Sequence, residues 1–257
     1  MEDQIEVIVG TGIYGQGNII KAVRNEGFQV RSINRLWPRD HYVHFNGRYV
    51  KSGSPGFIDG NSFGEGGNVL PGNGFLLVSD GVYIKEKFAK ILSDEPTYEQ
   101  IKEAILSKGR EYYPDARIHV APTGYFHKGK GHEHIDMLTL LLPKTKLLIL
   151  DTHFGKRAGT AKEYDEIAQA ERLKLIRFDS SQDGVWYPLN SLVLPKGDSE
   201  IVFVDTRASS LMRLLSQEGI RSIGIDMLKH TYPAGKIHCQ TNTCKLGDNI
   251  EGFLANS

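Results

Sequence analysis

Several features are scarce or missing in this sequence of 257 residues, and each absence excludes a class of protein. The two cysteines, Cys239 and Cys244, are spaced neither as a disulfide framework nor as a C-x-x-C metal pair. No apolar run approaches the roughly 18 residues of a membrane-spanning helix. The amino terminus lacks a basic segment followed by an apolar one, so we predict no signal peptide and expect a cytoplasmic protein.

An excess of charge is also absent. The 31 basic and 31 acidic side chains cancel, and like charges form no long run. Proteins that bind nucleic acids or anionic membranes usually carry a basic patch or tail. The composition therefore favours a globular protein with a small-molecule partner, without nucleic acid or membrane, and it is compatible with a homodimer.

The chain contains a repeated unit. In three places an apolar, β-branched segment runs into Gly-Thr or Asp-Thr, and a helical pattern and a second strand follow each of them. Glu-Gly closes two of the helices, where a glycine is favoured. The three junctions are EVIVGTG (6–12), LLILDTH (147–153) and IVFVDTR (201–207).

Hairpins are expected between these units. Asn46-Gly47 is a strong hairpin signal, and further turns are predicted at 71–74 and 143–146. The recurring unit is therefore strand, strand, helix, strand, of roughly fifty residues, and about five copies fill the chain. We predict one domain over residues 1–257, an α/β propeller with five-fold pseudosymmetry.

A glycine motif near the amino terminus suggests dinucleotide binding at first sight. Gly10, Gly12 and Gly15 spell G-x-G-x-x-G after a predicted strand. A Rossmann unit also needs an acidic residue at the end of its second strand, to hold the ribose. That strand ends here in Asn34 and Arg35. Because hairpins follow where the Rossmann fold continues with crossovers, we predict a flexible loop and no nucleotide cofactor.

Candidate chemistry begins in the segment GHEHIDMLTLLL. If it is a strand, His134 and Asp136 share one face. His127, His132 and Glu133 lie close by in sequence and allow a metal site to be considered. Their spacing matches no helix-borne zinc signature, so we expect no metal.

Cys239 is a candidate nucleophile, since it follows a strand expected at 236–238. A lone cysteine is often a small buried apolar residue, and a thiolate needs a nearby cation or base. His134 or His238 could supply one. Cys244 has only Lys245 as a charged neighbour in sequence, and we expect it to be structural.

Two further segments place polar residues directly before predicted hairpins. Arg39 and Asp40 follow Trp37-Pro38, and Glu65 is flanked by glycines. Glycine lets backbone and ligand approach closely. Taken alone, Glu65 fits a surface turn equally well, and Asp40 fits a capping acid.

The four segments together resemble one family. WPRD at 37–40, GEGGN at 64–68, HID at 134–136 and HCQTN at 238–242 occur in this order. They are similar to motifs of the guanidino-group-modifying enzymes, the pentein superfamily, which includes arginine, agmatine and peptidylarginine deiminases, dimethylargininases and amidinotransferases. The resemblance covers most of the chain, and the family fold is a five-fold α/β propeller.

The resemblance implies roles for these residues. Cys239 would be the nucleophile and His134 the general acid and base, with Glu65 orienting His134. Asp40 and Asp136 would grip the guanidinium. Arg39 would belong to the same substrate-binding set. Hydrolysis of a thiouronium adduct on Cys239 would give a citrulline-type urea and ammonia or an amine, without cofactor.

Other outcomes stay open at this stage. Attack by a second amine would make the chain an amidinotransferase, and a translation factor with the same fold is a non-catalytic binding module. A cysteine peptidase would explain Cys239 and His134 but not the three carboxylates. The loop at 10–17 is a candidate lid.

The rest of the substrate is not identified. Arginine deiminases carry an arginine shortly before the nucleophile, whereas this chain has Lys236, which puts free arginine in doubt. Arg35, Arg48 and Arg207 are alternatives that the sequence does not rank.

Overall fold

The fold was analysed in a computed structural model, which describes residues 5–12, 15–51, 63–84, 97–123, 134–155, 160–227 and 237–255. The strands are β1 (Ile5–Gly10), β2 (Gln29–Ile33), β3 (Tyr42–Phe45), β4 (Arg48–Lys51), β5 (Val69–Pro71), β6 (Phe75–Ser79), β7 (Arg117–Ala121), β8 (Thr139–Leu142), β9 (Leu147–Asp151), β10 (Lys174–Phe178), β11 (Leu192–Lys196), β12 (Ser199–Asp205), β13 (Arg221–Ile225) and β14 (Thr241–Lys245). The α-helices are α1 (Gln16–Asn25), α3 (Tyr98–Tyr112), α4 (Glu163–Glu171), α5 (Ser209–Gln217) and α6 (Ile250–Ala255). Short 3-10 turns are η1 (Pro38–His41), η2 (Gly66–Asn68), η3 (Asp80–Ile84), η4 (Ile135–Met137) and η6 (Ser180–Gln182).

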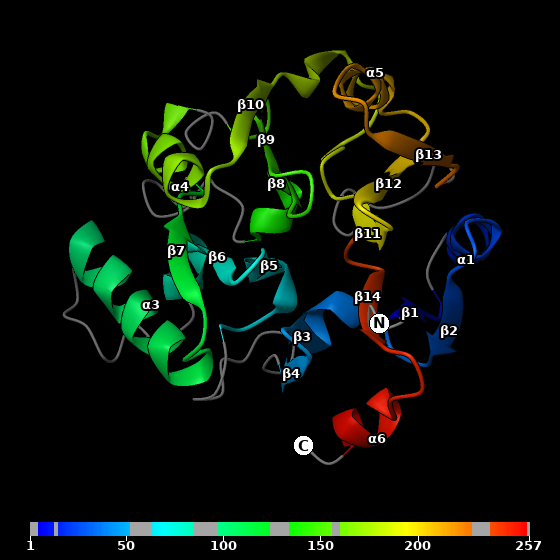
Figure 1. The fold of residues 1–257 in the computed structure, drawn as a ribbon, viewed down its shortest axis with the longest axis horizontal. Coiled ribbons are helices and arrows are strands. Elements are labelled where there is room, and N and C mark those ends of the chain that lie inside the picture. The colour runs from blue at the N-terminus through cyan, green and yellow to red at the C-terminus, as the bar shows by residue number, and fades with distance from the viewer. Residues whose placement is uncertain are drawn as a thin grey trace.

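The described strands form five small sheets around a common centre (Figure 1). Four have three strands, in the orders β14-β1-β2, β5-β6-β7, β10-β9-β8 and β11-β12-β13, and the fifth is the pair β3-β4. The last strand, β14, pairs antiparallel with the first, β1. The two ends of the chain therefore build one sheet together.

The predicted repeat is present. In each three-stranded sheet a parallel pair is joined by a helix: α1 joins β1 to β2, α4 joins β9 to β10, and α5 joins β12 to β13. The sequence pattern missed a fourth crossover, α3 between β6 and β7. Strand β6 ends at Ser79 and is followed by Asp80, without the Thr signature of the others, but Thr97 and Gln100 form a capping box that starts the helix.

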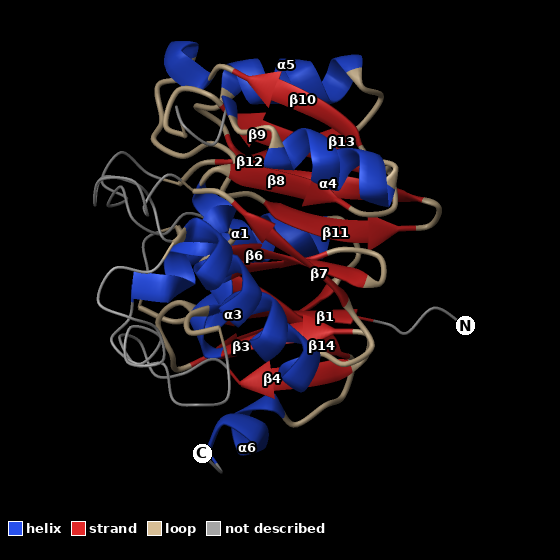
Figure 2. Cartoon of the chain, turned by 90° about the vertical axis from the view of Figure 1, so that its left-hand side faces the viewer, coloured by secondary structure: helices blue, strands red, loops and turns tan. Residues whose placement is uncertain are grey.

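The helices α1, α3, α4 and α5 lie on the outer side of the three-stranded sheets, away from their common centre (Figures 1 and 2). Strands β6 and β9, with sequences FLLVS and LLILD, are buried along their whole length. Continuous apolar runs of this kind are expected for strands buried on both faces.

The local turn predictions are confirmed. All three hairpins form, as β3-β4, β5-β6 and β8-β9. Asn46 and Gly47 both have positive φ, of 48° and 72°, which suits a tight two-residue turn. Gly27 and Gly219 follow α1 and α5 in the left-handed conformation.

Two expected strands are wrong. His134 and Asp136 do not alternate along a strand, because the chain makes the tight turn η4 and β8 begins only at Thr139. His238 and Cys239 also lie in a turn, before β14 begins at Thr241. A turn leaves these side chains outside the sheet ladder, where neighbouring units can meet them. Lys236 lies outside the described residues.

Pairing register brings these turns to one edge. Val69 at the start of β5 pairs with Val78 near the end of β6, and Thr139 of β8 pairs with Leu150 of β9. Thr241 of β14 pairs with Val9 of β1 in the same way. The segments that precede β5, β8 and β14 therefore lie at the edge where the parallel strands end.

Within the described part of the chain no helix is both long and apolar enough to cross a membrane.

Asn242 ties this edge together and gives the first prediction. Its Nδ2 donates to the backbone oxygens of Pro38 (3.1 Å) and Tyr42 (2.8 Å), and the side chain is fully buried. In the variant Asn242→Ala these carbonyls lose their donor, so we expect a loss of about 2 to 3 kcal/mol in the free energy of unfolding. Urea unfolding followed by circular dichroism measures it. The exposed variant Asn34→Ala is the control, and equal midpoints for both variants would contradict the prediction.

Candidate active site

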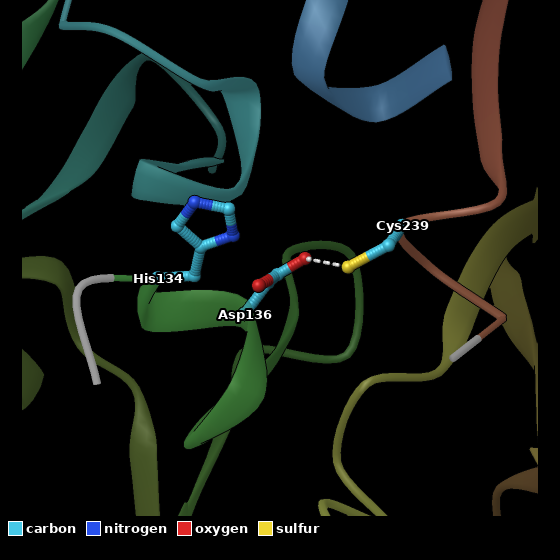
Figure 3. A group of neighbouring side chains, drawn as sticks. All are labelled: His134, Asp136 and Cys239. Carbon is cyan, nitrogen blue, oxygen red and sulfur yellow. Dashed lines mark hydrogen bonds between the residues drawn. The ribbon is translucent and has the colours of Figure 1, made fainter. Parts of the chain in front are cut away.

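Cys239 lies in the turn before β14 and is 3% exposed. Its sulfur accepts a hydrogen bond from Asn190 Nδ2 at 3.2 Å and lies 3.5 Å from Asp136 Oδ2 (Figure 3). The backbone N–H of Cys239 donates to Asn190 Oδ1 at 3.3 Å. The amide of Asn190 thus holds both the backbone and the sulfur of Cys239 in place.

Asp136 belongs to turn η4 and is 1% exposed. His238 Nδ1 lies 2.8 Å from Asp136 Oδ2, and the other oxygen, Oδ1, has no hydrogen-bond partner among the described residues. Burial alone would raise the pKa of Asp136, but the bond to His238 and the positive charges of His134 and Arg39 hold it below the usual value. Asp136 is therefore an ionised carboxylate with one oxygen available to a ligand.

His134 precedes η4 and pairs with Glu65, which precedes η2. The distance from His134 Nε2 to Glu65 Oε2 is 2.6 Å. Burial would lower the pKa of His134, but the bond to Glu65 and the charges of Asp40 and Asp136 together raise it to about 9. The imidazole is thus positively charged at neutral pH, in the state that donates a proton.

The two glycines after Glu65 allow this packing. A side chain at Gly67 would meet His134 Nδ1 at 2.5 Å and Asp136 Oδ1 at 3.1 Å, and one at Gly66 would meet the backbone oxygen of Arg39 at 1.9 Å. Neither position accepts a Cβ without movement of its neighbours. The E-G-G sequence therefore lets η2 lie directly against η1 and η4.

Asp40 faces the same cluster from η1. It is buried, and its Oδ1 accepts a hydrogen bond from Gly67 N at 3.3 Å. Burial, together with the charges of Glu65 and Asp136, raises the pKa of Asp40 to about 7, although His134 and the Gly67 N–H oppose the shift. At neutral pH this carboxyl is close to its midpoint, and a cation bound beside it would ionise it fully.

Burial also raises the pKa of the Cys239 thiol well above its usual value, and the charges of Asp136 and Asp40 add to the shift, whereas Asn190 opposes it. Neutralising the carboxylates is the direct way to form a thiolate here. Cys244 has charged neighbours that are distant in sequence: pairing of β1 with β2 and β14 places Glu6 and Arg31 beside its sulfur.

Arg39 lies next to Asp40 but points away from solvent, with 5% of its surface exposed. Its backbone N–H donates to the oxygen of Cys239 at 3.4 Å. The guanidinium remains positive although burial lowers its pKa, because Asp136 and other negative groups favour the charge. A cation in this place balances the carboxylates rather than attracting a second cation.

Some of these side chains have donor atoms close enough together to hold a metal ion. Donor atoms of His134, Asp136 and Cys239 lie within 4.8 Å of one another, as do those of Asp40, Glu65 and His134. A protonated His134 cannot coordinate an ion, so a metal would have to displace its proton and its bond to Glu65. His127, His132 and Glu133, which the sequence offered as further ligands, lie outside the described residues.

The structure thus brings all six predicted site residues into one region: Arg39, Asp40, Glu65, His134, Asp136 and Cys239. The sequence did not identify Asn190 as part of this region, and it did not predict the hydrogen bond between His238 and Asp136. Asn190 lies in the segment WYPLN, which has no recognisable motif. The only local sign of strain is in the structure: Tyr187 in this segment has a positive φ of 51°, unusual for a bulky residue.

Comparison with known proteins supports the fold. No family model matches the chain, and no curated protein matches its sequence. Solved structures do match. DDAH from Pseudomonas aeruginosa in complex with citrulline has a TM-score of 0.62 at 10% identity, over 93% of this chain and 98% of that one.

Two further structures are similar over nearly their whole length. C. jejuni agmatine deiminase has a TM-score of 0.57 at 16% identity, covering 95% of this chain and 94% of its own. An amidinotransferase of saxitoxin biosynthesis from Microseira wollei has a TM-score of 0.58 at 14% identity, covering 92% and 93%. The chain therefore shares its fold with these guanidino-modifying enzymes, as the motifs predicted.

The pKa of His134 gives the second prediction. Nitrogen NMR of the imidazole should show a midpoint near 9, and Glu65→Gln should lower it because the partner loses its charge. A raised pKa means that the charged imidazole stabilises the fold fully below about pH 6.5, and that this contribution is lost as the pH rises through about 9. Glu103→Gln, which changes a carboxylate bound to Arg110 on α3, is the control. A midpoint near 6.5 in the unaltered protein would contradict the pairing.

Asn190 gives the third prediction. Asn190→Leu removes the amide that donates to the Cys239 sulfur, so the pKa of the thiol should rise further and alkylation at pH 8 should slow by roughly tenfold. The pH profile of iodoacetamide labelling, read by mass spectrometry, measures it. Asn18→Leu, at an exposed position on α1, should leave the profile unchanged. A profile that does not move in Asn190→Leu would show that the amide contact has no effect on the thiolate.

Proposed function

We propose that this chain is a Cys239-dependent hydrolase of a guanidino substrate, built as a single five-bladed α/β propeller over residues 1–257. The observation that carries the proposal is Asp136 Oδ1, a buried carboxylate oxygen to which no described residue donates a hydrogen bond, beside Asp40 and the sulfur of Cys239. Buried ionised oxygens are ordinarily paired, so an unpaired one in a cluster of acids predicts a cationic ligand.

A guanidinium suits this arrangement because it is planar, positively charged and rich in N–H donors. Asp136 Oδ1 and the Asp40 carboxylate can accept from different nitrogens and fix the plane of the group. Asp136 also lies next to the Cys239 sulfur, at 3.5 Å from its Oδ2. The central carbon of a guanidinium held by Asp136 therefore comes within reach of the nucleophile.

Binding of the cation prepares the nucleophile. The negative charges of Asp136 and Asp40 help keep Cys239 protonated, so a guanidinium that neutralises them favours the thiolate. Asn190 Nδ2, at 3.2 Å from the sulfur, then donates to the charged form. Substrate binding and activation of the nucleophile are thus the same event, and the free enzyme keeps an unreactive thiol.

The reaction then follows in two steps. The sulfur bonds to the guanidinium carbon, and His134, charged at neutral pH, gives its proton to the departing ammonia or amine. The neutral imidazole next takes a proton from water, whose oxygen bonds to the same carbon as the C–S bond breaks. A urea is released and Cys239 is restored. Glu65 holds the imidazole in place throughout.

A second reaction class uses the same cluster. If an amine rather than water attacks the adduct, the chain is an amidinotransferase, as one structural neighbour is named. A non-catalytic binding module gives no reason for a buried cysteine, acid and imidazole within a few ångströms of one another. The assembled cluster therefore favours an enzyme.

Two of the three arginines considered for binding a substrate carboxylate are held by ion pairs with acidic side chains. Arg48 is paired with Asp115 at 2.6 Å, and Arg207 is held by Asp205 through two nitrogens. Arg35 is the third cation that the sequence left open for a substrate carboxylate, and it is exposed in the segment between β2 and η1.

In the candidate lid, Gly12 and Gly15 both have positive φ, and Gly12 lies near Leu36.

The fourth prediction tests the reaction. Purified protein is given arginine, agmatine, methylarginines and arginyl peptides, and ureido product and ammonia or amine are measured. We expect turnover of at least one substrate, abolished in Cys239→Ser and retained in Cys244→Ser. Transfer to added glycine or ornithine without ureido product would indicate the amidinotransferase instead. No reaction with any of them would contradict the proposed function.

A further inference from the structure

A cavity of about 290 Å³ lies behind the catalytic cluster; we call it the rear cavity. At its inner end are Arg39, Asp136 and His238. It then follows β8 from Thr139 to the turn that starts at Pro143, and reaches the exposed Lys144. Since β8 begins at the catalytic edge, Lys144 lies at the opposite edge of the sheet, and the cavity connects the back of the site to the other face.

Arg39 is the unusual group in this cavity. It is 5% exposed, its Nε has no hydrogen-bond partner, and it forms no ion pair within 4 Å with any acid of the described residues. Buried arginines are ordinarily paired, because an isolated charge is costly to remove from water. A cationic side chain without a direct partner that lines a cavity of this size predicts an anionic ligand.

The two acids in the lining are already engaged. Glu200 accepts hydrogen bonds from the backbone of Lys144 and Thr145 and from the Thr145 hydroxyl, at 2.8 to 3.1 Å. Asp136 uses Oδ2 for His238, and its Oδ1 lies close to Gly67. Their charges disfavour a dianion such as phosphate in the same cavity and leave a monoanion as the suitable charge.

The walls between the two ends are largely apolar. Aliphatic side chains and proline rings lie along the whole length, so a ligand with a charged head and a hydrocarbon body fits better than a fully polar one. The apolar lining residues are Leu70, Pro71, Leu140, Leu141, Pro143, Leu189, Val193 and Pro195.

We propose that the rear cavity binds a short aliphatic monocarboxylate, with its carboxylate on the Arg39 guanidinium and its chain along the apolar walls. A planar carboxylate matches the fork of a guanidinium. The ligand enters past Lys144, so it does not need the substrate entrance. This site does not depend on the proposed reaction, because its contacts are to Arg39 and the cavity walls.

Occupancy of the rear cavity is coupled to Cys239. The positive charge of Arg39 favours the thiolate and the ionised Asp136. A carboxylate on Arg39 cancels that charge, so the bound protein should alkylate more slowly at Cys239. By linkage, the thiolate form of Cys239 binds the anion more weakly, by the same factor by which the bound anion disfavours the thiolate.

Binding is tested by thermal unfolding of the full chain with sodium acetate, propanoate and butanoate at constant ionic strength. We expect a saturable rise in Tm, with affinity increasing roughly fourfold for each added methylene, because each enters an apolar environment. Butylammonium chloride, with the same chain and the opposite charge, should give none. Labelling of Cys239 by iodoacetamide should slow as butanoate saturates.

The position of the ligand is tested with a filled cavity. Val193→Phe, a half-buried valine of β11 that lines the cavity, should weaken butanoate at least tenfold, and Val50→Phe, a half-buried valine of β4 outside it, should not. If Val193→Phe does not fold, imidazole NMR of the unaltered protein replaces it, with shifts expected for His44 and His238 and not for His153. No saturable rise in Tm, or equal binding in both variants, would show a cavity that holds water only and overturn the proposal.

Discussion

The site depends on the burial of several carboxylates in one small volume. Asp40 and Asp136 are both buried, Glu65 is close to them, and water is largely excluded from all three. Such a group of like charges is unfavourable unless cations or hydrogen-bond donors compensate it. The compensation comes from His134, which is bound to Glu65, from His238, which is bound to Asp136, and from the positive charge of Arg39, which forms no direct ion pair with these three acids.

The cluster still has one more negative charge than positive charges, and this imbalance has chemical consequences. Asp40 titrates near neutrality, and the Cys239 thiol stays protonated. Both features follow from negative potential in a dry site. In the proposed mechanism a guanidinium supplies the missing positive charge, so recognition of the substrate and activation of the nucleophile are inseparable. The anion proposed for the rear cavity would act in the opposite sense, through Arg39.

The backbone geometry of the turns allows these side chains to pack close together. The residues of the cluster come from the turns η1, η2 and η4 and from the turn before β14, not from strand interiors. Gly66 and Gly67 remove the side chains that would keep η2 away from Arg39 and His134. Asn242 ties η1 to β14, and Asn190 ties the turn of Cys239 to the segment before β11. Short turns at one edge of a ring are thus sufficient to place side chains from five sheets together.

The sequence by itself determined the local structure and the identity of most chemical groups. The hairpin at Asn46-Gly47, the crossover helices with their closing glycines, and the continuous apolar strands follow from turn chemistry and burial pattern, which are local properties. Through short motifs it also named six residues that the fold brings into one region. It failed at the starts of β8 and β14, where an alternating pattern concealed a turn.

Only the tertiary structure decided how these groups act on one another. Asn190 is 49 residues from Cys239, and His238 is 102 residues from Asp136, so no local pattern could pair them. The unusual pKa values of His134, Asp40 and Cys239 and the unpaired charge of Arg39 arise from burial and from charges that other elements bring near. Electrostatic energies depend on distance and solvent access, and both exist only once the chain has folded.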